Sequence, residues 1–398
     1  MTRFFLSEGA DVNLRCQNGD TPLHLTLRKF VLDLDETSPS QPSDFVRVQD
    51  AWSDGRWKIE SLKDMIEDSE DEDAAEIYHT VTKARIEVID ILLGHPNIEV
   101  GLKNIIGETP MHLLPFGKEH SMTLFSKLAN KSPQMTVLND KGQTPLHIAC
   151  LKGDQEIANH LLHLEPSSAS TLDSQGLSTL HYAIRSENIQ IITILLSHFA
   201  KQGWSTCTQE HRRSLLHFYL ERPLCYPRMV NVLLDYGESA NFINKEGDSP
   251  LSIYLKSYHL ENKRAICQLL IEHGAHPLWT NSLGETLAHV RMHSSVEDGQ
   301  VLQVLQDFNL NILAKDHSNK SILHHAAIYG TVSQRLVASL PNHSVRSLCE
   351  PDYDGLTPLM YAKKKCASEA EVEDEFLNDQ KWQTSLDLLR KMEADLVE

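Results

Sequence analysis

The fold is decided by a nine-residue stretch, Gly142-Gln143-Thr144-Pro145-Leu146-His147-Ile148-Ala149-Cys150. The hydroxyl of Thr144 can accept a hydrogen bond from a free N–H group in the first turn of a helix, so Thr144 suits the N-cap position. Pro145 then occupies the first helical position, where its missing N–H costs nothing and its fixed φ favours the helix. Leu146 and Ala149 are three residues apart and share one helix face. The stretch therefore predicts a helix capped by Thr144.

The same four-position frame recurs along the whole sequence: Thr or Ser, often Pro, an apolar residue, and usually His. After a first step of 88 residues, successive copies start 34 to 37 residues apart. A fixed period of this length predicts a solenoid, in which each unit buries its apolar face against its neighbours. The copies begin at Thr21, Thr109, Thr144, Ser178, Ser214, Ser249, Thr286, Ser321 and Thr357.

The frame and its period resemble the ankyrin repeat, whose signature is Thr-Pro-Leu-His-x-Ala at a period of about 33 residues. The resemblance implies an all-α solenoid of stacked helix-turn-helix units with β-turn or hairpin tips. It also implies that the frame residues are structural, with the histidines hydrogen-bonding within and between neighbouring turns. These frame residues are Thr21, His24, Thr109, His112, Thr144, His147, His181, His217, His289, His324 and Thr357.

The repeat spacing divides the chain into four parts. Residues 1–13 are typical of the second helix and loop of a partial N-terminal repeat, which indicates either a missing upstream segment or an imperfect cap. Residues 14–100 form a repeat with a long acidic insertion at about 33–80, and residues 101–350 a regular array. Residues 351–398 form a final repeat with an acidic insertion at 366–378 and a capping helix at 379–394. Within the first insertion, residues 57–66 have helical spacing and either pack onto the stack, dock another protein or cover the groove as an intramolecular lid.

The formal net charge of −18 belongs to two segments. Residues 33–76 carry −11 and residues 366–398 carry −7, so the rest of the chain is neutral. Nucleic-acid binding by phosphate neutralisation needs a basic footprint, and the sequence has none. The acidic runs at 67–76 and 369–375 are typical of solvated loops, with contact to a basic partner as the alternative.

The apolar pattern and the cysteines bear on location. No apolar run reaches the roughly 18 residues that a transmembrane helix requires, so we expect no membrane insertion. The seven cysteines are scattered and show no CxxC pair, which is typical of reduced thiols in a cytoplasmic or nuclear protein.

The 21 histidines prompt the question of a metal site. The seven frame histidines fall in successive repeats, about 10 Å apart at helix-packing distances, whereas zinc ligands lie about 2.1 Å from one shared ion. His324 and His325 are adjacent on a helix and are expected to point apart. No His-Glu-x-x-His, Gly-x-Ser-x-Gly, P-loop or Gly-x-Gly-x-x-Gly motif is present. We therefore expect no metal, no cofactor and no catalytic residue, and a protein that is not an enzyme.

Without a metal, cofactor or catalytic site, the candidate functional feature is the surface of the repeats. In ankyrin-like stacks the tips and first helices line a concave groove to which partners bind. Exposed apolar residues are typical binding hot spots, although Ile105 and Ile106 could instead pack against neighbouring turns. By position, the candidate partner-binding residues are Ile105, Ile106, Lys141, Gln175, Lys245, Asn281, Asp316 and Tyr353.

The sequence thus predicts a non-enzymatic scaffold or adaptor that binds another protein through the ankyrin groove. The alternative is the recognition region of a larger regulatory or enzymatic protein whose N-terminal part is missing from this chain. The identity of the partner and the oligomeric state stay open.

Overall fold

The computed structural model describes residues 2–32, 71–118, 120–131, 135–202, 213–256, 263–293, 312–340, 345–369 and 378–395. The chain forms two compact units, Met1–Trp204 and Ser205–Glu398. In the described ranges the regular elements are helices, and extended pairing is limited to the isolated bridges Leu172–Ser178 and Thr280–Thr286. The prediction of an all-α repeat fold is confirmed.

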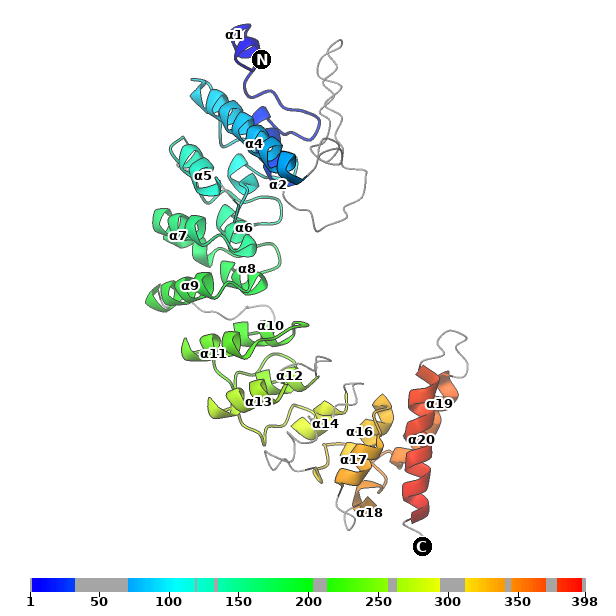
Figure 1. Cartoon of the computed structure of the whole chain (residues 1–398). Coiled ribbons are helices and arrows are strands. Elements are labelled where there is room, and N and C mark those ends of the chain that lie inside the picture. Colours follow the sequence, from blue (N-terminus) through cyan, green and yellow to red (C-terminus); the bar gives the residue numbers. More distant parts are fainter. Residues whose placement is uncertain are drawn as a thin grey trace. The chain divides into compact units, whose positions relative to one another are not determined.

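The first unit stacks helix pairs in two rows (Figure 1). The first helices of the pairs contact one another in chain order, and so do the second helices. The first row contains α2 (Pro22–Leu32), the 3-10 turn η2 (Pro110–Leu113), α6 (Pro145–Lys152) and α8 (Thr179–Ser186). The second row contains α4 (Asp71–Gly94), α5 (Ser121–Ala129), α7 (Gln155–Leu164) and α9 (Ile189–Gln202). The short helix α1 (Thr2–Ser7) contacts α4, and the turn η3 (Pro166–Ser170) lies between α7 and α8.

The second unit repeats this arrangement. Its first helices contact one another in series, and its last two helices pack together. The first row contains α10 (Leu215–Leu220), α12 (Pro250–Lys256), α14 (Leu287–Arg291), α16 (Ile322–Tyr329) and α19 (Pro358–Glu369). The other helices are α11 (Pro227–Asp235), α13 (Lys263–Glu272), α17 (Gln334–Ser339), α18 (Val345–Leu348) and α20 (Asn378–Asp395).

Helix α6 shows how the opening stretch folds. The backbone N–H of His147 donates to the Thr144 hydroxyl at 3.4 Å, and Pro145 is the first helical residue. Gly153 ends the helix with a left-handed φ of 73°, a conformation that glycine adopts without steric cost. Leu146 and Ala149 are fully buried, so the helix is held by packing of its apolar face.

Two elements differ from the sequence expectation. The frame at Thr109 starts only the single turn η2, because Leu114 is extended (φ −59°, ψ 145°) before Pro115, and a residue that precedes proline is driven out of the helical region. The second helix of the first repeat begins at Asp71, within the insertion expected at about 33–80, so residues 71–76 of the acidic run are helical and not a loop. Acidic residues at a helix N-terminus interact favourably with its dipole.

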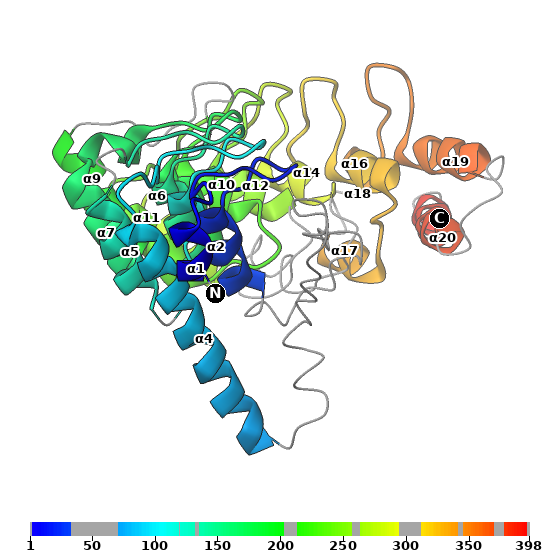
Figure 2. The same cartoon turned by 90° about the horizontal axis from the view of Figure 1, so that it is seen from above.

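The N-terminal end of α4 extends past the neighbouring helices of its unit (Figure 2). Residues 33–70, including the expected helix at 57–66, lie outside the described residues. At the other end of the chain, α20 lies where the capping helix is predicted and contacts α19 and α16. It buries one apolar face that consists of Trp382, Leu386, Leu389 and Met392.

Candidate functional site

The frame histidines tie each repeat to the next. In each of the seven frames that contain histidine, the side-chain hydroxyl of the Thr or Ser lies 2.8 to 3.0 Å from the histidine Nδ1. In five of them the opposite ring nitrogen, Nε2, donates to a backbone carbonyl of the following repeat at 3.0 to 3.2 Å. These five pairs are His24–Glu108, His112–Gln143, His217–Asp248, His289–Lys320 and His324–Leu356.

Burial keeps these imidazoles neutral. Desolvation lowers the pKa of His147, His181, His289 and His324 to about 4, and it also lowers the pKa of the other three. Where both ring nitrogens of a frame histidine are hydrogen-bonded, as in His289 and His324, neither nitrogen is available to a ligand.

A buried or partly buried Asn or Asp shapes six of the described tips. Its Oδ1 accepts backbone N–H groups two and four residues further along; for Asn139 these are Lys141 at 3.0 Å and Gln143 at 2.9 Å. Such Asx turns fold the chain back on itself. The same two bonds are made by Asn104, Asp173, Asn281, Asp316 and Asp352.

The tips are joined by backbone hydrogen bonds. In most of the described repeats, the first residue after the Asx donates its N–H to the carbonyl of the second residue of the preceding tip. In the first unit, Asp140 donates to Ile106 at 3.1 Å and Ser174 donates to Lys141 at 2.9 Å. In the second unit, His317 donates to Leu283 at 3.0 Å and Tyr353 donates to Ser318 at 3.1 Å. The tips are thus linked through their backbones, which leaves their side chains directed to solvent.

Six of the eight candidate partner-binding residues occupy these two exposed positions. Tyr353 is 77% exposed, Ile105 64% and Ile106 47%, so the two isoleucines are not buried against neighbouring turns. Lys141, Gln175 and Lys245 are also exposed.

The other two candidates, Asn281 and Asp316, have a role within the turns. They are the turn-forming Asx residues, and their side chains bond the backbone of their own tips. The exposed positions are the next two residues along the chain. Leu283, which is 61% exposed, is therefore the apolar tip residue of that repeat. Counting residues back from Gly284 in the frame would have identified Asn281 as the turn-forming residue and Leu283 as an exposed residue.

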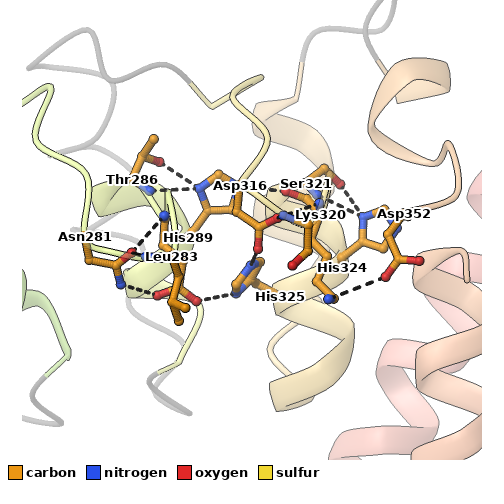
Figure 3. Close-up of polar contacts among 12 residues, drawn as sticks. Asn281, Leu283, Thr286, His289, Asp316, Lys320, Ser321, His324, His325 and Asp352 are labelled. Carbon is orange, nitrogen blue, oxygen red and sulfur yellow. Dashed lines mark hydrogen bonds and ion pairs between the residues drawn. The ribbon is translucent and has the colours of Figure 1, made fainter. Parts of the chain in front are cut away.

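In three of the described repeats, a side chain on the first helix contacts the Asx residue behind the tip. The hydroxyl of Tyr182 donates to Asp173 Oδ2 at 2.6 Å and accepts from Gln143 Nε2 at 2.7 Å. Tyr361 makes the same contact with Asp352 at 2.7 Å. In the repeat that precedes that of Tyr361, His325 replaces the tyrosine. Its Nε2 lies 3.1 Å from Asp316 Oδ2 (Figure 3).

This replacement creates a group of three potential metal ligands. Among the residues that the structure describes, Glu285, His293 and His325 bring one ligand atom each to within 4.8 Å of one another. Burial alone raises the pKa of Glu285, but contacts with His293 and Asn281 outweigh it and lower this pKa to about 2. The sequence expectation of no metal site relied on the spacing of the frame histidines, on the adjacent pair His324 and His325 and on the absence of ligand motifs, so it missed residues that the stacking of repeats brings together.

Two further observations limit the chemistry. None of the helices described is long and apolar enough to cross a membrane. The cysteines in the described ranges are free thiols, and burial raises the pKa of the Cys150 thiol well above its usual range, which makes this thiol a poor nucleophile.

Comparison with known proteins identifies ankyrin repeats in this chain. A family model of ankyrin repeats in three copies matches residues 73–166 and 117–206. The tyrosine-protein kinase Shark of Drosophila melanogaster is 32% identical over 116 residues, which cover 29% of this chain and 12% of the kinase. The nuclear factor NF-kappa-B p105 subunit of Gallus gallus is 25% identical over 181 residues, which cover 44% of this chain and 18% of that protein.

A solved structure, the human ASB11 ankyrin repeat domain, is 20% identical with a TM-score of 0.48, and the match covers 59% of this chain and 99% of that domain. The chain thus spans less than a fifth of the length of the kinase and of the p105 subunit.

Proposed function

Because this chain is an ankyrin-repeat protein, we propose that it is a non-enzymatic scaffold or adaptor that binds a partner protein through its hairpin tips and the adjoining first helices. Ankyrin repeats are protein–protein interaction modules, and the relatives are varied regulatory proteins. The observation that carries the proposal is that the residues of a tip have separate structural and exposed roles. The Asx side chain and the backbone hold the tip, and the two residues that follow the Asx are left exposed.

The apolar tip residues support this proposal. Ile105, Ile106, Leu283 and Tyr353 are large and exposed, although none is required for stacking. Apolar and aromatic side chains at such positions supply much of the binding energy of protein interfaces once they are desolvated. The neutral charge of the repeats outside the acidic segments supports a protein partner and gives no support to a nucleic acid.

The test compares two matched triple variants in affinity capture from a cell lysate, followed by mass spectrometry. The tip variant carries Ile105→Ser, Ile106→Ser and Tyr353→Ser. The control variant carries Leu164→Ser, Leu224→Ser and Tyr226→Ser, which remove two exposed aliphatic residues and one exposed tyrosine away from the tips. We expect a protein that the unmodified chain and the control retain and the tip variant loses. Equal retention by the two variants would exclude the tips as the binding surface.

A second candidate function is that of a recognition region within a larger regulatory or enzymatic protein. It is favoured by the small share of the kinase and of the p105 subunit that the chain matches. An immunoblot of cell extract with an antibody against this chain distinguishes the two. A band well above the mass of the 398-residue chain supports the larger protein, and a single band at the mass of the chain contradicts it. Fractionation of the same cells tests the proposed cytoplasmic or nuclear location.

A further inference from the structure

We propose that Glu285, His293 and His325 form a binding site for a divalent metal ion of the zinc class, which joins two successive repeats. Glu285 and His293 flank α14, and His325 lies on α16 of the next repeat. This inference is independent of the proposed partner binding, because it rests on a buried side-chain group and not on the tips.

The distances between the three ligand atoms match a zinc site. His293 Nε2 lies 3.2 Å from His325 Nδ1 and 3.5 Å from Glu285 Oε1, and His325 Nδ1 lies 3.6 Å from Glu285 Oε1. Ligands at about 2.05 Å from a tetrahedral zinc ion are about 3.35 Å apart. Neighbouring ligands of an octahedral ion at the same bond length are only about 2.9 Å apart. The three observed distances therefore fit a tetrahedral ion with one further position open to water or another ligand.

The surrounding groups orient the ligand atoms. Asp316 Oδ2 faces His325 Nε2 at 3.1 Å, so this nitrogen carries the proton and donates to the carboxylate. The lone pair of His325 is then on Nδ1, which faces Glu285 and His293. On the other side, Asn281 Nδ2 donates to Glu285 Oε2 at 2.5 Å and leaves Oε1 directed at the histidines. Metal-binding histidines are typically held by a carboxylate in this way.

Glu285 and His325 are buried and His293 is partly exposed, which leaves a route for an ion to enter. The neighbouring His289, whose ring centroid lies 4.9 Å from that of His325, has both nitrogens occupied by Thr286 and Lys320 and is not a ligand.

Comparison with the other repeats shows what is particular to this site. In the first unit, Gln143, Tyr182 and Asp173 occupy the positions of Glu285, His325 and Asp316 and form a closed hydrogen-bond chain. A tyrosine hydroxyl bonded to Asp173 and Gln143 satisfies that contact fully. His325 makes the same bond to its aspartate with one nitrogen and retains a second nitrogen for a ligand. The difference provides variants that restore the ordinary contact and remove the metal ligands.

The test measures Zn²⁺ binding to the full chain, first stripped with a chelator, by isothermal titration calorimetry. Co²⁺ serves as a spectroscopic probe, because four-coordinate Co²⁺ has intense visible absorption. The first variant is the double substitution Glu285→Gln and His325→Tyr, which copies the arrangement of Gln143 and Tyr182. The second is His293→Gln. The matched control is His276→Gln, an exposed histidine in the same unit.

We expect the unmodified chain and H276Q to bind one Zn²⁺ at this site. Both site variants should lower the affinity at least about tenfold, since even loss of a supporting residue costs about 10- to 100-fold. The rise in the thermal unfolding midpoint that Zn²⁺ causes in the unmodified chain should also disappear in these two variants. The midpoint measured in the presence of chelator shows whether each variant has folded. Zn²⁺ affinity that both folded site variants retain would place the ion elsewhere and overturn the proposal, as would failure of the unmodified chain to bind Zn²⁺.

Discussion

Gly142 and Gly176 occupy the same position in successive tips of the first unit, and their replacement by alanine should have unequal effects. Both have a left-handed backbone, with φ of +72° and +76°. A Cβ atom on Gly142 would lie only 2.7 Å from the backbone nitrogen of Ser174 in the next tip, whereas a Cβ on Gly176 would meet nothing within 4 Å. The two substitutions therefore share a conformational cost and differ in a steric one.

The expected magnitudes follow from these contacts. A left-handed alanine costs about 1 kcal/mol in either tip. At Gly142 the added methyl group also pushes away Ser174, whose N–H donates to the Lys141 carbonyl at 2.9 Å. Loss of one backbone hydrogen bond costs about 0.5–1.5 kcal/mol, and displacement of the adjoining tip adds to that. We expect Gly142→Ala to destabilise the chain by about 2–3 kcal/mol and Gly176→Ala by about 1 kcal/mol.

Urea unfolding of the full chain, followed by far-UV circular dichroism, measures the free energy of unfolding of each variant. The two variants are compared with the unmodified chain in the same unfolding transition. If the two variants lose the same free energy of unfolding, the hydrogen-bonded contact between tips contributes nothing to stability. The explanation of how neighbouring tips of the first unit are held together would then be wrong.

Three further predictions concern the buried groups. Tyr182→Phe should cost about 1–3 kcal/mol in urea unfolding, because the change leaves Asp173 and Gln143 without their shared hydroxyl; Tyr353→Phe is the exposed control, and an equal effect of both would contradict the role of the bond. Trp382→Ala should cost about 3–5 kcal/mol, since this buried ring holds α20 against the stack; an unchanged thermal midpoint would show that α20 does not cap the unit. Acidification should destabilise the chain, because burial lowers the pKa of histidines such as His147 to about 4 from 6.5. The unfolded chain takes up these protons first, so stability that is full above about pH 6.5 is lost as the pH falls towards 4, by at most about 3 kcal/mol for each such histidine; a thermal midpoint that stays constant across this range would contradict it.

The sequence predicted the repeat fold because each frame specifies its own local structure. A Thr cap, a proline at the first helical position and apolar residues on one face define α6 without reference to the rest of the chain. Where a neighbouring residue overrides the frame, prediction was less accurate. Pro115 shortens η2 to one turn, and helix-favouring acidic and alanine residues extend α4 back to Asp71.

The candidate site was predictable only in part, since its residues have different roles at adjacent positions. Ile105 and Tyr353 are exposed as expected, but Asn281 and Asp316 are one or two positions from the exposed residues and form the turns themselves. The group of Glu285, His293 and His325 has no sequence motif, because its members come from two repeats and converge only when the repeats stack.

The affinity of the purified chain for the partner that it captures tests the central claim most directly. Titration calorimetry would compare the tip variant (I105S, I106S and Y353S) with the control variant (L164S, L224S and Y226S). We predict that the control binds as tightly as the unmodified chain and that the tip variant binds at least about tenfold more weakly, which corresponds to about 1.4 kcal/mol. Equal dissociation constants for the two folded variants would contradict partner binding at the tips.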